Sequence, residues 1–181
     1  MQGALDAERL IFIDESGCHP GIGPRRGWAP RGQPLSGPEQ PYARGQHVSM
    51  IAALTTDGID AMMTTDGGVK TQDIQRFVEQ RLVPLLRRGD IVCWDNLNAH
   101  KNPAVVAAIQ EAGARVLWLP RYSPDLNPIE AAWSKVKTLI RQAVPQSVTE
   151  LKAAIRRALH RVSASDALGW FAYCGYQVPS L

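Results

Sequence analysis

An apolar strand, a proline-rich turn and the start of a helix are joined in the stretch Leu119-Pro-Arg-Tyr-Ser-Pro-Asp-Leu-Asn-Pro-Ile-Glu130. Three prolines within nine residues exclude regular structure from the middle of this stretch. Asn127 followed by Pro128 is typical of an N-cap and a first helical residue, so we predict that a helix begins at Pro128. The apolar side of that helix follows a 3.6-residue period through Ile129, Ala132, Trp133, Val136 and Ile140.

Strands and helices alternate through the rest of the chain. His47 to Thr55, a turn at Thr56-Asp57-Gly58 and Ile59 to Thr65 predict an antiparallel hairpin. Helices are expected after Thr71, after Asn102 and after the Ser147 capping box. Three strands followed by helix, strand, helix, strand and helix predict an α/β fold with a mixed five-stranded sheet flanked by helices.

A long segment, Ser16 to Gln46, interrupts this order. It holds seven Gly and six Pro, which favours an irregular insertion with at most a short strand near residues 27–30. Its polar and aromatic side chains form a cluster able to contact a polyanion or a partner subunit, with disorder as the alternative. That cluster is Arg25, Arg26, Trp28 and Arg31.

Length and composition favour one globular domain over residues 1–181. The apolar runs are far shorter than the roughly 20 residues of a membrane span, no signal peptide is evident, and the three cysteines form no CxxC pair, so we expect a cytoplasmic protein. The net charge is +3, and the last 61 residues carry eight of the 20 Lys and Arg but four of the 17 Asp and Glu. This basic third suits phosphate groups or, alternatively, is a solvated helix face.

Two apolar runs lead directly into acids. Leu10 to Ile13 precedes Asp14, and Ile91 to Trp94 precedes Asp95. Because neighbouring strand ends share one edge of an α/β sheet, the two carboxylates are expected to lie close together and to repel each other unless a cation lies between them. Oxygen ligands favour Mg²⁺. Asp also favours turns and caps, which is the structural alternative for either residue alone.

Glu130 is the natural third acid, with 34 residues between it and Asp95. The alternative is a cap, since Glu130 could reach back to the backbone N–H of Asn127. Helix geometry places Glu130, Lys137 and Arg141 on one stripe, so an acid adjoins a basic track. Three convergent carboxylates are expected to raise at least one pKa of the set.

Three segments together resemble the catalytic domain of the insertion-sequence 630 family of transposases, in the Tc1/mariner group of DDE enzymes. They are Phe12-Ile-Asp-Glu-Ser-Gly17, Trp94-Asp-Asn-Leu-Asn-Ala-His100 and the stretch ending at Glu130, extended by Trp133 and Lys137. The resemblance covers nearly the whole chain, from about Leu10 to Tyr176. It implies a ribonuclease H-like fold.

The resemblance also implies the chemistry. Asp14, Asp95 and Glu130 would bind two Mg²⁺ (or Mn²⁺) ions that support cleavage and transfer of DNA strands. Asn96 and His100 would orient ligands or DNA, with a hydrogen-bonded structural role as the alternative. From the basic third of the chain, Lys135, Lys137 and Arg141 are expected to contact phosphates. The Ser16–Gln46 insertion corresponds to a segment that contacts the partner subunit, which implies a homodimer acting on transposon ends and on target DNA, with TA dinucleotides as the target sites.

One departure concerns the N-terminus. Only about nine residues precede the first strand, so we expect no helix-turn-helix DNA-recognition domain and no reading of a specific end sequence. The chain would be a catalytic fragment, a split-frame product or a decayed copy. Two alternatives remain: a catalytically silent DNA-binding or self-associating remnant, and a ribonuclease H acting on RNA–DNA hybrids.

Overall fold

The computed structural model describes residues 5–24, 27–34, 46–96 and 101–178. Within these ranges the strands form a five-stranded sheet in the order β3-β2-β1-β4-β5. β1 pairs antiparallel with β2 and parallel with β4, and β5 continues the parallel half. The strands are β1 (Leu10–Cys18), β2 (Val48–Thr55), β3 (Gly58–Asp66), β4 (Ile91–Trp94) and β5 (Arg115–Trp118). The predicted mixed α/β sheet is confirmed.

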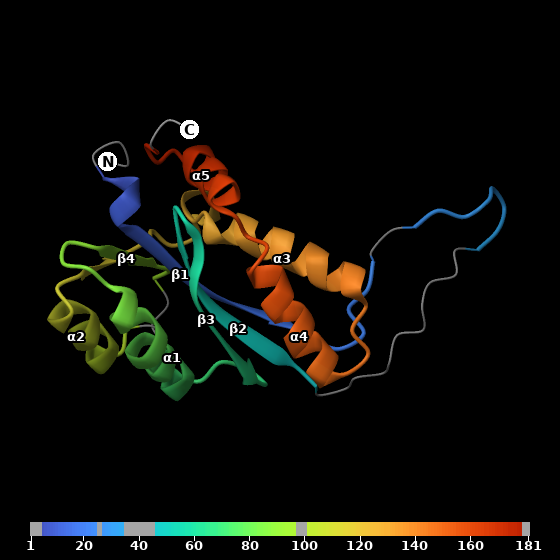
Figure 1. The fold of residues 1–181 in the computed structure, drawn as a ribbon, viewed down its shortest axis with the longest axis horizontal. Helices are drawn as coiled ribbons and strands as arrows, with labels where there is room; N and C mark the ends of the chain where they lie inside the picture. The colour runs from blue at the N-terminus through green and yellow to red at the C-terminus, as the bar shows by residue number, and fades with distance from the viewer. Residues whose placement is uncertain (1–4, 25–26, 35–45, 97–100, 179–181) are drawn as a thin grey trace.

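Helices cover both faces of the sheet (Figure 1). α1 (Thr71–Phe77) and α2 (Pro103–Glu111) lie on one face, and α3 (Ile129–Ala143), α4 (Val148–Leu159) and α5 (Ala164–Tyr173) lie on the other. Short turns complete the order: 3-10 turns at Ala7–Arg9, Val83–Leu85 and Pro124–Leu126, and a π-helical turn at Val78–Leu82 that continues α1. None of the described helices is long and apolar enough to cross a membrane.

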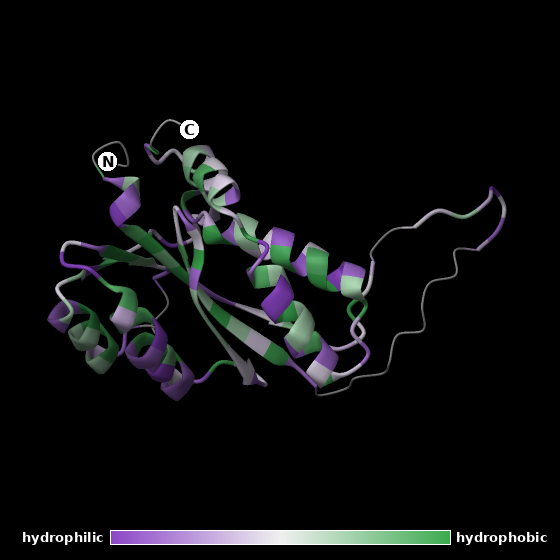
Figure 2. Cartoon of the chain, in the orientation of Figure 1, coloured by the Kyte–Doolittle hydropathy of each residue, from purple (hydrophilic) through white to green (hydrophobic). Residues whose placement is uncertain are grey.

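The side chains of β1 point alternately to the two faces of the sheet, and the hydrophobic core is divided into two clusters, one on each face. Leu10 and Phe12 are buried with α3, α4 and α5, whereas Ile11 and Ile13 are buried with α1 and α2. Figure 2 shows apolar residues along the strands and along the helix sides that cover them. Successive side chains of a strand point to opposite faces, so the next even position, Asp14, belongs to the α3 side.

β1 is longer than the sequence predicts. We expected it to stop at Asp14 and the insertion to begin at Ser16, but β2 pairs with β1 as far as Cys18, where the partner is Val48. The antiparallel ladder supplies backbone hydrogen bonds that the polar side chains do not disturb. The insertion therefore begins at His19, and no strand forms at residues 27–30.

The helix starts are partly as predicted. Asn102 and Ser147 cap α2 and α4 through their side-chain oxygens. α1 is capped by Lys70 rather than Thr71, because the Asp73 carboxylate accepts from the Lys70 backbone N–H at 3.0 Å.

The start of α3 also differs from the prediction. Pro128 is the N-cap residue and already has helical backbone angles, and the Asn127 side chain makes no cap. The Asn127 backbone carbonyl instead accepts the Glu130 N–H at 3.2 Å. This correction leaves the Asn127 side chain available for another role.

Candidate active site

Asp14 lies within β1 and faces α3. The indole Nε1 of Trp133 donates a hydrogen bond to its Oδ2 at 2.9 Å. Trp133 is buried on the apolar side of α3, so its ring is fixed by packing. The helix thus fixes one oxygen of the carboxylate.

The pKa of Asp14 is raised to about 7, chiefly because burial removes water from the carboxylate. A backbone hydrogen bond at Glu15 acts in the opposite direction, and the negative charges of Glu15 and Glu130 raise the pKa further. The expected rise of one pKa in the acidic set is therefore present, although burial contributes more than the neighbouring acids. A positive charge at this place would favour the ionised form.

Asp95 follows β4 directly, on the strand beside Asp14. The parallel register pairs Ile13 with Trp94, which puts the two acids at the same level of the sheet. β5 ends at that level too, because the Leu119 N–H donates to the Trp94 carbonyl at 2.8 Å. Three parallel strands therefore bring Asp14, Asp95 and the 119–130 connector to one edge.

A cavity of about 450 Å³ opens at this edge. Its wall combines the residues after β4 with the connector and the first turn of α3: Asp95, Asn96, Leu119, Pro120, Arg121, Tyr122, Ser123, Pro124, Asn127 and Glu130. Asp14 is not part of this wall but interacts electrostatically with Glu130. Two acids of the predicted triad thus line one cavity, and the third is close enough to Glu130 to feel its charge.

Glu130 does not act as a cap. Its side chain is exposed and makes no hydrogen bond with any described residue, while its backbone N–H is satisfied by Asn127. A carboxylate at the start of a helix is favoured by the helix dipole and, without a protein partner, is free to accept a ligand.

The donor set of the cavity suits a hard cation and its water ligands. The side-chain oxygens of Asn96 and Asn127 are buried without a hydrogen-bond partner in the described structure. Buried acceptors of this kind normally receive a hydrogen bond or bind an ion. No three His, Cys, Asp or Glu side chains in the described ranges are gathered closely enough to hold a metal by themselves. The residues therefore fit a cation that is bound partly through water or substrate oxygens.

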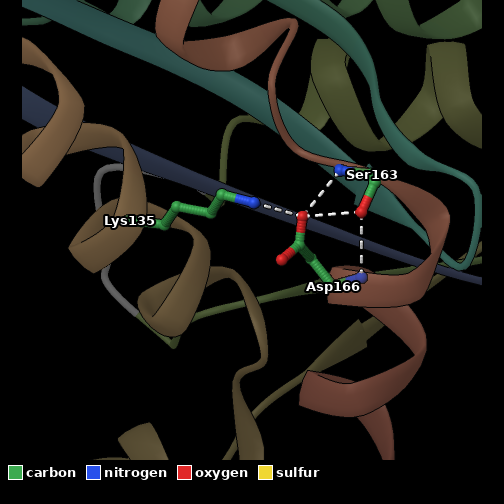
Figure 3. Close-up of polar contacts among 3 residues, drawn as sticks. All are labelled: Lys135, Ser163 and Asp166. Atoms are coloured by element: carbon green, nitrogen blue, oxygen red, sulfur yellow. Dashed lines mark hydrogen bonds and ion pairs between the residues drawn. The ribbon is translucent and has the colours of Figure 1, made fainter.

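The predicted basic residues of α3 fall into two groups. Lys137 and Arg141 lie near the end of β1, since their positive charges oppose the rise that burial causes in the pKa of the Cys18 thiol. Charged side chains of α3 therefore lie beside β1, from the acidic Glu130 near Asp14 to the basic Arg141 near Cys18. Lys135 has a different partner: it forms an ion pair with Asp166 at the start of α5, beside Ser163 (Figure 3).

Of the other predicted contacts, only Asn96 lines the cavity within the described ranges. Arg25, Arg26 and His100 are outside the described residues. Trp28 and Arg31 are exposed, on a segment that lies away from the sheet and helices (Figure 1). Asn96 lines the cavity beside Asp95 as expected.

Sequence reasoning missed Arg121, Tyr122 and Ser123 as cavity residues. We interpreted them as a rigid connector, because Gly, Pro and Ser clusters usually mark turns. Their position after a parallel strand could have indicated this role. The connector leaves that strand at the same edge of the sheet as the two acids, so it must border the space beside them.

This arrangement defines a class of protein. An acid within β1, a second acid directly after the neighbouring parallel strand β4, and a glutamate on a helix packed across the same sheet are typical of ribonuclease H-like domains that act on phosphodiesters with metal ions. The family model of the DDE superfamily endonucleases matches residues 9–152. The chain belongs to that family. A search of curated proteins finds no match.

Solved structures agree with the fold. The Mos1 mariner paired end complex with Mn matches at 18% identity and a TM-score of 0.70, covering 93% of this chain and 52% of that chain. The Mos1 strand transfer complex matches at 17% identity and a TM-score of 0.69, covering 93% and 51%. The Mos1 transposase catalytic domain with raltegravir and Mn matches at 15% and 0.65, covering 93% and 78%. The chain spans about half the length of the first two.

Proposed function

We propose that this chain is the catalytic domain of a Tc1/mariner-type DDE transposase, cleaving and joining DNA strands with Mg²⁺ or Mn²⁺. The observation that carries the proposal is the shared edge of the sheet, where Asp95 and Glu130 line a cavity with unsatisfied amide oxygens and Asp14, on the strand beside Asp95, interacts electrostatically with Glu130. The family match supports the reaction class. Mos1 structures with Mn and with Mg support the choice of metal.

Asp14, Asp95 and Glu130 would hold the cations, two per site. Bound cations would lower the pKa of a coordinated water and offset the charge that develops on the phosphate. The chain contributes position: Trp133 holds Asp14 through Oδ2, and the amide oxygens of Asn96 and Asn127 orient water in the cavity. Ionisation of Asp14 is required, and its pKa of about 7 makes this step dependent on pH.

The reaction is displacement at phosphorus. In cleavage, a water oxygen bonds to phosphorus, its proton passes to solvent, and the bond to the 3′ oxygen breaks, leaving a 3′ hydroxyl and a 5′ phosphate. In strand transfer that 3′ hydroxyl replaces water as the nucleophile on a second strand, and another 3′ oxygen leaves and takes up a proton. No cofactor oxidation or group donor is needed for either step.

The basic side chains Lys137 and Arg141 of α3 would contact the phosphates of bound DNA. Lys137 and Arg141 follow Glu130 toward the end of β1, so a phosphate backbone crossing the cavity would meet them next. The Mos1 paired end complex and the Mos1 strand transfer complex support transposon ends and target DNA as substrates. Two further parts of the proposal are a homodimer contacted through the 19–46 insertion, with Trp28 and Arg31, and target sites at TA dinucleotides.

Nicking of supercoiled plasmid tests the proposal. Wild-type protein should convert the plasmid to open circles in Mg²⁺ and not in EDTA, and Asp95→Asn should abolish the conversion. Asp125→Asn is the matched control, because Asp125 is an exposed acid of the same connector that does not line the cavity. Equal nicking by wild type and Asp95→Asn would overturn the assignment. Binding of plasmid without nicking, unaffected by any of the acids, would support a silent remnant.

A further inference from the structure

Tyr122 combines two unusual properties at the cavity. Its side chain is 99% exposed, and its backbone has φ +58°, in the left-handed region that non-glycine residues rarely adopt. It lies between Pro120 and Pro124, in a turn where the Ser123 hydroxyl donates to the Arg121 carbonyl at 3.4 Å. A glycine or asparagine would adopt this conformation at lower cost.

The Tyr122 side chain is too exposed for its packing against the described residues to offset the free-energy cost of this backbone conformation. Trp28, Leu85 and Tyr173 are the other large apolar side chains exposed in the described ranges, and none of them lines the cavity that holds Asp95 and Glu130. Strained residues persist where the surrounding structure enforces them and often mark ligand contacts. The ring of Tyr122 is therefore presented to solvent at the rim of the acidic cavity.

The neighbouring residue indicates what kind of ligand meets this ring. Arg121 is exposed, lines the same cavity and forms no ion pair with the described residues. A guanidinium suits a phosphate, and an aromatic face suits a nucleobase. A nucleotide offers both groups a few ångströms apart, whereas an apolar protein partner would leave the Arg121 charge without a counterpart.

We propose that the Arg121–Tyr122 turn is a nucleotide-binding rim, at which Tyr122 stacks on the base beside the reacting phosphate and Arg121 contacts the adjoining phosphate. This inference rests on the proposed function, because it takes DNA as the substrate. Stacking on an aromatic ring needs no particular base, so the rim would hold the DNA end without reading its sequence. The fixed turn would present the ring before DNA arrives, which lowers the ordering cost of binding.

Paired changes in protein and DNA test the contact. The probe is a short duplex with a three-nucleotide single-stranded end, intact or with one base removed at each position in turn. Kd is measured by fluorescence anisotropy at one fixed salt concentration with Ca²⁺ as the cation, and a gel confirms that the strands stay intact. Wild type should lose roughly tenfold in affinity when the stacked base is missing. On intact DNA, the affinity of Tyr122→Ala should be lower than that of wild type by a similar factor. Removing the stacked base should cause no further loss of affinity in this variant.

Three variants separate stacking from folding. Tyr122→Phe keeps the ring and should bind like wild type. Tyr122→Asn relieves the backbone strain, so its Tm should equal or exceed that of wild type while its affinity falls as in Tyr122→Ala. Tyr173→Ala removes another exposed tyrosine, on α5 and outside the cavity wall, and should bind DNA like wild type.

The outcomes distinguish this inference from the proposed function. Equal sensitivity of wild type and Tyr122→Ala to the missing base, or insensitivity of both, would overturn the stacking role. Plasmid nicking that depends on Asp95 would in that case leave the proposed function intact. If Asp95→Asn nicks like wild type but Tyr122 and the base are coupled, the rim stands as a DNA-binding feature and the catalytic assignment fails.

Discussion

Two carboxylates that contact α3 lie in opposite environments. Asp166 accepts hydrogen bonds from the Ser163 N–H at 2.9 Å and the Ser163 hydroxyl at 2.7 Å and pairs with Lys135, and these contacts, with that of Lys135 the largest, lower its pKa to about 2 (Figure 3). Asp14 is half-buried near two other acids, Glu15 and Glu130, with Trp133 as its side-chain donor, and its pKa is raised to about 7. The same helix stabilises one charge and leaves the other poorly compensated.

The difference separates an acid whose charge the fold neutralises from an acid of the proposed metal site. Asp166 completes a capping box and joins α5 to α3, so its charge is neutralised within the fold. Asp14 has no such cation partner among the described residues, and the negative charges of Glu15 and Glu130 lie near it. Bringing like charges together costs folding free energy unless a cation binds. A carboxylate whose pKa is raised by burial and by neighbouring acids is thus the physical feature that distinguishes the proposed site. Each prediction below tests one side of this comparison.

The largest effect is expected for Asp14→Asn. Nicking should fall by roughly 10²-fold or more, because one ligand of the reacting centre is lost. Metal-free stability should change in the opposite direction. Because the folded pKa of Asp14 is raised, the wild type loses stability as pH rises from about 4 through about 7, and the variant should not.

Thermal unfolding in EDTA at pH 5 and pH 8, together with the nicking assay, checks both parts. Asp125→Asn, which carries the same chemical change on an exposed acid, is the control. A Tm that falls with pH equally in Asp14→Asn and wild type would contradict the view that Asp14 is a poorly compensated charge.

A smaller effect is expected for Trp133→Phe. The substitution keeps most of the buried ring but removes the hydrogen bond that lowers the pKa of Asp14. That pKa should rise, so protons compete better with metal. The apparent Mn²⁺ affinity at pH 7 should drop by roughly tenfold and recover at higher pH.

Titration of Mn²⁺ by electron paramagnetic resonance at pH 7 and pH 9 measures this shift. Trp170→Phe, a change of the same kind on α5, is the control. A loss of Mn²⁺ affinity that is identical at both pH values would show that Trp133 acts through packing alone.

On the structural side, Asp166→Ala should destabilise the fold by about 1 kcal/mol, the usual cost of losing a capping group. The wild-type contribution of Asp166 is present above about pH 4 and is lost as the pH falls toward 2, so Asp166→Asn should flatten the acid limb of the stability profile. Urea unfolding at pH 7 and at pH 3 measures both effects. Nicking per folded molecule should remain at the wild-type level. A loss of nicking would contradict the view that Asp166, unlike Asp14, has only a structural role.

The smallest change in stability is expected for Glu130→Gln. Because the side chain is exposed and caps nothing, unfolding free energy should change by no more than about 0.5 kcal/mol. The rise of Tm on adding Mn²⁺ should nevertheless shrink, since one ligand is weakened. Differential scanning fluorimetry with and without Mn²⁺ distinguishes these roles, and an unchanged Mn²⁺ response would remove Glu130 from the metal site.

The secondary structure was largely predictable because it depends on local periodicity. The apolar period of α3, Ile129 to Ile140, is fully buried as expected, and so are Leu151, Ile155 and Leu159 of α4. The predicted order of strands and helices is confirmed. Element ends were less predictable: β1 extends past Asp14 because its partner β2, some thirty residues away in sequence, continues the ladder.

The candidate site was likewise predictable only in part. The types and spacing of Asp14, Asp95 and Glu130 identified the acids and, through the motif, the family. Sequence could not show that the Asn127 side chain enters the cavity wall instead of capping α3, nor that Lys135 pairs with Asp166. Both depend on which groups from distant segments lie within hydrogen-bond reach.

The amino-acid sequence by itself determined the elements and the chemical groups, because hydrophobic periodicity and residue type act over a few neighbouring positions. Tertiary structure decided that Asp14 is poorly compensated, that Lys135 is already paired, and that the strained Tyr122 lines the cavity. Burial and electrostatic interactions depend on distances through space, and those distances are fixed when β1, β4, β5 and α3 pack together.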